Sequence, residues 1–260
     1  MSEPTQNFSR RGALRLLGMA AGAVVAARMA PASATTVSLR PGGAQTLRAL
    51  MSKLDAAPRR RSFKSVPFLV DSSDFWDHEA AMEIISYRGH PTQVWENSEI
   101  AAAWPNLMRE SLNGQVFAHR NLDFLAVSAT HGSAHLALFN QAMWDKYALA
   151  SRTGGVFKNN SLIVEKAGIA PSDDREDVDG FYGFKNSNIT TLQRRGVVFI
   201  ACHDSIHAIA RGLVNGNSEN ADAIAADLSN NLIPGAVLVP SVVAFLPQLQ
   251  RAGFTYAKGA

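Results

Sequence analysis

The stretch Gly196-Val-Val-Phe-Ile-Ala-Cys202-His203-Asp204 decides the fold. Its apolar, β-branched run from Val197 to Ala201 shows no polar alternation, which is typical of a strand buried on both faces of a parallel sheet. The next segment carries apolar residues at the spacing of one helical stripe, at Ile206, Ile209, Ala210, Leu213 and Val214. The pattern therefore predicts a strand that ends at Cys202 and a helix that begins there.

Similar alternation extends in both directions from this stretch. Strands are predicted at 92–95, 122–128, 197–201, 237–239 and 254–256. Helices are predicted at 44–56, 73–87, 97–112, 133–147, 203–214, 218–232 and 241–249, and Pro105 offers a later start for the third of them. Strands that alternate with helices require right-handed crossovers, so the fold class is α/β with a mainly parallel sheet flanked by helices.

The first residues have the pattern of a twin-arginine export signal. Arg10-Arg11 precede a weakly apolar run from Leu16 to Ala27, and Ala32-Ser33-Ala34 supplies a small-x-small cleavage site. We therefore expect a leader over 1–34, recognition by the twin-arginine translocase, and a periplasmic or otherwise extracytoplasmic protein exported in the folded state. An N-terminal extension with docking helices is predicted over 35–91, and the main α/β domain over 92–260, with a long insertion at 150–195.

The apparent basicity of the chain belongs to its leader. The whole sequence has 25 Lys and Arg against 22 Asp and Glu. The leader holds four arginines and one glutamate, so the remaining residues are formally neutral. This balance gives no electrostatic footprint for nucleic acid. No later stretch is long and apolar enough to predict a membrane span.

Cys202 is the sole cysteine, so it has no partner for an intramolecular disulfide. A thiol at a strand's carboxyl end and a helix's amino end lies where α/β proteins bind ligands, and the positive potential there favours the thiolate. A thiolate attacks sulfane sulfur or a disulfide. The alternative is a buried, inert thiol, since free cysteine is among the most buried residue types.

Two histidine pairs share the same spacing, His203 with His207 and His131 with His135. Each pair follows a predicted strand, so the two pairs could meet at one sheet edge and, with Cys202, supply ligands for zinc or copper. No HExxH, CxxC or carboxylate cluster accompanies them, and each histidine alone is more typical of a hydrogen-bonded surface or core residue than of a metal ligand. Patterns for a nucleophile elbow, a P-loop and a dinucleotide fingerprint are absent too.

Several short motifs resemble the DsrE/DsrF-like family. They are Gly196 to Cys202, Leu232-Ile-Pro-Gly-Ala-Val-Leu-Val-Pro-Ser241, Leu249-Gln250 with Gly253-Phe-Thr-Tyr256, and, for its long exported branch, His131-Gly132 with Leu138 to Tyr147. The resemblance covers roughly 92–258 outside the insertion. It implies a three-layer α/β sandwich, symmetric oligomers and, in sulfur-oxidising members, a cysteine that carries persulfide sulfur. Cys202 matches that cysteine, whereas His203 replaces a residue that is usually small and polar.

The sequence thus predicts an exported protein that handles reduced sulfur by a sulfurtransferase-like thiol relay and requires no cofactor. Cys202 would accept or donate sulfane sulfur, while His203 or His131 tunes its proton. We expect a homo-oligomer, because the helices around Trp144 and Phe245 carry many large apolar residues, and a sulfur-carrier protein as partner. The alternative is a non-catalytic oligomeric module that binds a metal or small ligand at the same edge.

Overall fold

The computed structural model describes residues 39–214 and 220–259, all within one compact unit that spans Thr35–Ala260. The predicted export signal over 1–34 and the first two residues of the predicted helix over 218–232 lie outside the described residues. None of the described helices combines the length and the hydrophobicity that crossing a membrane requires.

A five-stranded, all-parallel sheet forms the centre, in the order β4-β3-β2-β1-β5. Its strands are β1 Thr92–Asn97, β2 Leu125–Thr130, β3 Val198–Cys202, β4 Val237–Val239 and β5 Thr255–Lys258. The α/β prediction is therefore confirmed, and every strand runs in the same direction. The first four strands progress toward one edge, and β5 returns to the other side of β1. Right-handed crossovers consequently place the connection from β4 to β5 on the opposite face from the earlier ones.

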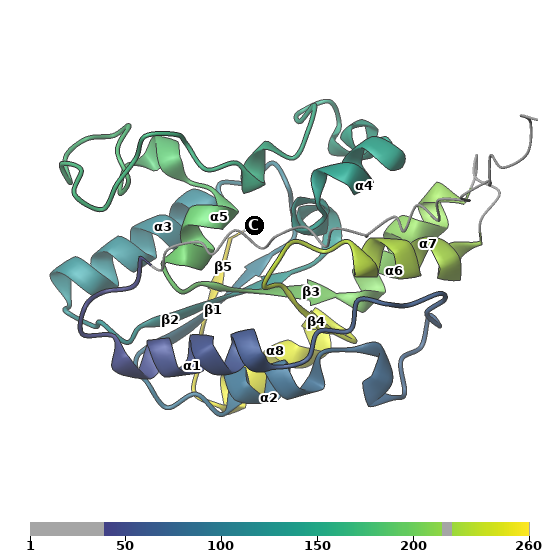
Figure 1. Cartoon of the computed structure of the whole chain (residues 1–260), viewed down its shortest axis with the longest axis horizontal. Helices are drawn as coiled ribbons and strands as arrows, with labels where there is room; N and C mark the ends of the chain where they lie inside the picture. The colour runs from purple at the N-terminus through teal and green to yellow at the C-terminus, as the bar shows by residue number, and fades with distance from the viewer. Residues whose placement is uncertain (1–38, 215–219, 260) are drawn as a thin grey trace, which may run out of the picture. The chain divides into compact units, whose positions relative to one another are not determined.

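Helices cover both faces of the sheet (Figure 1). One face carries α3 Trp104–Asn113, α5 Ile189–Arg194, α6 His203–Leu213 and α7 Ala221–Asn230, with α4 Gln141–Lys146 beside them. The other face carries α1 Gln45–Ala56, α2 His78–Ile85 and α8 Val242–Arg251. Side chains alternate along each strand, so β3 sends Phe199 and Ala201 into the first core and Ile200 and Cys202 into the second.

The segment 58–77, which we call the strap, connects α1 to α2 along the β4 side of the sheet. Asp77 fastens it to that edge strand: its backbone N–H donates to Leu238 O (2.9 Å), and its carboxylate accepts from Leu238 N–H (2.8 Å) and from the Arg61 guanidinium (2.9 Å). The Asp77 side chain is fully buried. The strap thus pairs polar groups that an exposed edge strand would leave open.

Two predicted helices are interrupted. The prediction over 133–147 is wrong in part, because the chain forms a 3-10 helix, η3 Gly132–Leu138, and then the separate helix α4. Phe139 is extended between them and bridges to Leu232, and Asn140 caps α4 by accepting from Met143 N–H. The predicted helix over 73–87 is likewise divided into η1 Ser73–Phe75 and α2. The apolar residues keep helical spacing across both breaks, so the sequence pattern did not predict them.

The insertion over 150–195 packs against the domain. Its last helix is α5, and Arg195 follows at the turn into β3. The buried Arg195 guanidinium donates to Asn113 Oδ1 at the end of α3 (2.7 Å) and lies over the rings of Phe181 and Tyr182, at 6.0 and 5.4 Å. Burial lowers the pKa of Arg195 to about 10. The insertion is therefore anchored to α3 by the hydrogen bond from Arg195 to Asn113, and its own Phe181 and Tyr182 pack against the same guanidinium.

Candidate functional site

Cys202 ends β3 and directly precedes α6, as predicted. Its thiol, however, belongs to the core shared with α8, and the residue is only 2% exposed. The backbone N–H of Val242, the first residue of α8, donates to Cys202 Sγ at 3.4 Å. From the sequence we expected the amino end of α6 to provide the positive potential at the thiol. The structure supplies an N–H donor from α8, because side-chain alternation turns Cys202 toward that layer.

The loop after β3 is joined to the loop after β4. Asp204 N–H, in the first turn of α6, donates to Pro240 O at 3.2 Å. Chains leave β3 and β4 toward opposite faces of the sheet, since α6 and α8 lie on opposite faces. Such a divergence creates the crevice in which open α/β sheets bind ligands. Cys202 therefore lies at the topologically favoured position, although in the described structure the surrounding chain closes over it.

His131 is the most accessible of the predicted site residues, with a side chain 21% exposed. Its Nε2 lies 3.0 Å from Glu96 Oε1, and Tyr256 donates a short hydrogen bond to Glu96 Oε2. The Tyr256 hydroxyl, then His131, hold the pKa of Glu96 below its usual value, and the same bond raises the pKa of Tyr256. Glu96 and Tyr256 therefore fix one ring nitrogen of His131 at the carboxyl edge of the sheet.

His131 and Cys202 occupy neighbouring positions on one face of the sheet. Thr130 pairs with Ala201 in the parallel register of β2 and β3, and His131 and Cys202 are the next residues. The histidine backbone remains extended, with φ of −146°. Side chains alternate along both strands, so both residues project toward the α8 layer. No hydrogen bond joins the Cys202 thiol to a histidine among the described residues.

The strap covers the other histidine pair. His203 Nε2 lies 2.8 Å from Pro67 O, and His207 Nε2 lies 3.0 Å from Val66 O, with the two rings 4.8 Å apart. Both residues are fully buried, and burial lowers the pKa of His203. The hydrogen bonds of these imidazoles thus hold the strap on α6.

His135 is fully buried, and neither ring nitrogen has a hydrogen-bond partner among the described residues. Burial lowers its pKa to about 3, and the nearby His131 and His203 add to the effect. His135 therefore lies within electrostatic range of His131 and of His203. Within residues 39–214 and 220–259, however, no group of three or more His, Cys, Asp or Glu has the arrangement to hold a metal ion.

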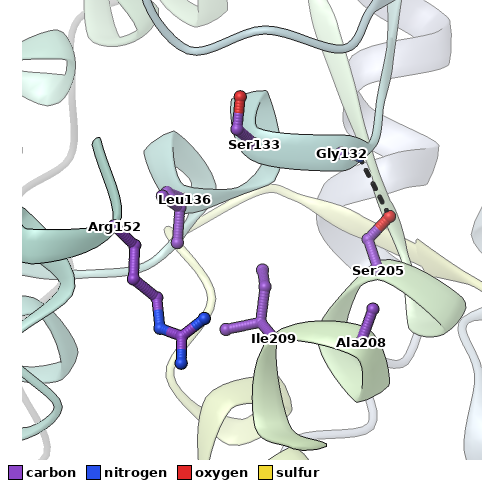
Figure 2. Close-up of a pocket in the computed structure, with 7 residues that line it drawn as sticks. All are labelled: Gly132, Ser133, Leu136, Arg152, Ser205, Ala208 and Ile209. Carbon is purple, nitrogen blue, oxygen red and sulfur yellow. Dashed lines mark hydrogen bonds between the residues drawn. The ribbon is translucent and has the colours of Figure 1, made fainter. Parts of the chain in front are cut away.

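A pocket of about 240 Å³ opens between η3 and α6, on the face opposite α8. It is lined by Gly132, Ser133, Leu136, Arg152, Ser205, Ala208 and Ile209. Figure 2 shows Ser205 pointing from α6 toward Gly132 at one end, and Arg152 beside Ile209 at the other. Sequence reasoning missed Arg152, which lies in η4 Leu149–Thr153 within the insertion and gave no motif.

Comparison of the chain with protein-family models, with curated proteins and with solved structures finds no match.

Proposed function

We propose that this protein handles reduced sulfur through Cys202, as a persulfide carrier or a sulfurtransferase-like relay. One observation carries the proposal: the sole thiol lies at the carboxyl edge of a parallel sheet and accepts the N–H of the first residue of a ten-residue helix. A helix amino end stabilises negative charge, and a hydrogen bond to a thiolate is stronger than one to a thiol. The helix amino end and the N–H donor are the features that support attack by a cysteine on a sulfane donor.

His131 is the proton-handling residue in this proposal. It is the next residue on the neighbouring strand, and Glu96 leaves its second ring nitrogen for exchange with solvent or substrate. His203, the other residue predicted to tune the thiol, has its Nε2 against the strap carbonyl of Pro67. Because Cys202 is 2% exposed, loading also requires local opening of the chain around α8.

The test is sulfur loading of the purified protein, followed by intact-mass spectrometry. Incubation with polysulfide should add multiples of 32 Da, and Cys202→Ser should abolish the addition because no second cysteine exists. Val242→Pro removes the N–H donor at a first helical position, where proline is well accepted, and also replaces the buried Val242 side chain. That variant should load roughly tenfold more slowly. Ser241→Ala, which removes the α8 cap but keeps the Val242 N–H, is the matched control.

A second function, a non-catalytic small-ligand module, is favoured by two observations: Cys202 is buried, and a pocket opens on the other face of the sheet. A thiol that stays unmodified in the folded protein, yet reacts fully with iodoacetamide in 6 M guanidinium, would exclude the sulfur relay. Selective loading followed by transfer to an acceptor protein would exclude the inert module.

Export and assembly belong to the same proposal. Replacing Arg10 and Arg11 by lysine should leave uncleaved precursor in the cytoplasm, and normal processing of that variant would contradict export by the twin-arginine route. The protein should also form a homo-oligomer, and a monomeric mass by light scattering at micromolar concentration would contradict that expectation.

A further inference from the structure

We propose that the pocket between η3 and α6 binds a short aliphatic carboxylate. Its volume of about 240 Å³ corresponds to roughly eight water molecules at about 30 Å³ each. That space suits a compact organic acid of a few carbon atoms. Three apolar side chains, those of Leu136, Ala208 and Ile209, form the wall between the two polar ends of the pocket.

The charge of the pocket selects an anion. Arg152 is its one charged lining residue, and no carboxylate lines it. One guanidinium nitrogen of Arg152 donates a short hydrogen bond to Gly212 O at the end of α6. Arg152 makes no ion pair with any acidic residue in the described part of the chain. The remaining N–H groups of its planar fork match the two oxygens of a carboxylate.

The opposite end offers a hydroxyl donor. Ser205 Oγ accepts the Gly132 N–H at 3.2 Å, which leaves the Ser205 proton to donate to a ligand oxygen. Ser133 Oγ, in contrast, already accepts from Ile100 N–H and donates to Ser98 O. Ser205 is therefore the hydroxyl that remains available to a bound molecule.

Backbone geometry at Gly132 builds this end of the pocket. Gly132 has φ of +55°, and a Cβ there would lie 2.6 Å from Ser98 O. Only glycine therefore lets the β2–η3 turn approach β1's exit and direct its N–H at Ser205. None of the pocket residues is Cys202, whose Sγ faces the α8 layer. The site consequently does not depend on the reactivity of the thiol.

The experiment is isothermal titration of the purified protein with sodium pentanoate at constant ionic strength, compared with acetate and with pentanol. Each added methylene should strengthen binding by roughly fourfold as it enters the apolar wall. Pentanol has the same chain without the charge and should bind at least tenfold more weakly than pentanoate.

Variants then identify the site. Arg152→Gln should weaken pentanoate binding at least tenfold, Arg152→Lys should restore part of it, and Ala208→Phe should abolish it by filling the exposed side of the pocket. Arg251→Gln, which removes another exposed arginine, in the last turn of α8, should bind as the wild type does. Thermal unfolding of each variant by circular dichroism verifies that it is folded.

Three results would overturn the proposal. The first is no saturable binding of pentanoate up to about 10 mM, since a weak ligand of this size should bind with a Kd of about 1 mM. The others are equal binding of pentanoate and pentanol, and unchanged pentanoate binding in folded Arg152→Gln and Ala208→Phe. Pentanoate binding that follows these variants while Cys202 stays inert would support the site and reject the sulfur relay.

Discussion

The two histidine pairs have the same spacing and opposite surroundings. His203 and His207 lie in one α-helix, where four residues bring side chains to the same face, and their rings are 4.8 Å apart. His131 is extended and His135 lies in a 3-10 helix, so one imidazole reaches Glu96 and the other enters the core without a partner. Identical spacing therefore predicts a shared environment only where the backbone is one continuous helix.

Loosening the strap that covers His203 and His207 should have the largest effect on the free energy of unfolding. Asp77→Ala removes a buried carboxylate, breaks its ion pair with Arg61 and leaves the Leu238 N–H unpaired. Breaking such a pair lowers the free energy of unfolding by about 3–5 kcal/mol. Urea denaturation measures it, and Asp74→Ala, an exposed acid in the same connection, serves as control. A loss below 1 kcal/mol would show that the strap is held by other contacts.

The unpaired member of the second pair should give the protein a marked pH dependence. The pKa of His135 is about 3 in the folded state, and the unfolded chain takes up a proton near pH 6.5. The unfolded state therefore binds more protons below pH 6.5, and the free energy of unfolding falls by up to about 1.4 kcal/mol per pH unit toward the folded pKa. The full stabilisation is present above pH 6.5.

His135→Leu isolates this contribution. The substitution removes two nitrogens that have no partner among the described residues, so the free energy of unfolding at pH 7 should stay constant or rise. The slope of the free energy of unfolding against pH should decrease between pH 6.5 and 4.5 by the equivalent of one proton. The buried His203, whose pKa is also lowered, should still contribute to the pH dependence that remains. An unchanged slope would show that His135 is charged or solvated in the folded protein.

A paired histidine should respond in the opposite sense. His207→Leu leaves the carbonyl of Val66 without its imidazole donor, and a buried unsatisfied acceptor costs about 1–3 kcal/mol. The loss should appear in urea denaturation at pH 7, where His135→Leu is neutral. If His207→Leu and His135→Leu change the free energy of unfolding equally, the hydrogen-bonded and the unpaired histidine do not differ in their contribution to stability.

Sequence reasoning recovered the centre of the sheet because β2, β3 and β4 are largely apolar runs bounded by turns. Val197 to Ala201 is the clearest example, and it required no knowledge of neighbours. Side-chain partners are a different matter, since they depend on strand order. The donor to Cys202 comes from α8, forty residues later, and Glu96 meets His131 only because β1 and β2 are adjacent. Arg152 lines the pocket but belongs to the insertion, whose sequence has no periodic apolar pattern from which its position could be predicted.

The smallest effect should arise at the exposed histidine. Tyr256→Phe removes the hydrogen bond that is the largest cause of the lowered pKa of Glu96. That pKa should therefore rise toward its ordinary value, as measured by NMR titration of the side-chain carboxyl. A carboxyl with a lowered pKa stabilises the fold above its unfolded pKa, and the contribution is lost as pH falls through the folded value. Because Tyr256 is 45% exposed, the change in the free energy of unfolding at pH 7 should stay below about 1 kcal/mol.

Thr255→Ala on the same strand keeps the Tyr256 hydroxyl and should leave the Glu96 titration unchanged. If Tyr256→Phe also leaves it unchanged, His131 and Lys258 hold the carboxylate without the tyrosine. Glu96 would then orient His131 without support from β5. The Glu96–His131 pair would in that case resemble an ordinary surface ion pair. A raised Glu96 pKa, by contrast, would show that Tyr256 on β5 stabilises the carboxylate of Glu96 on β1, to which His131 is hydrogen-bonded after β2.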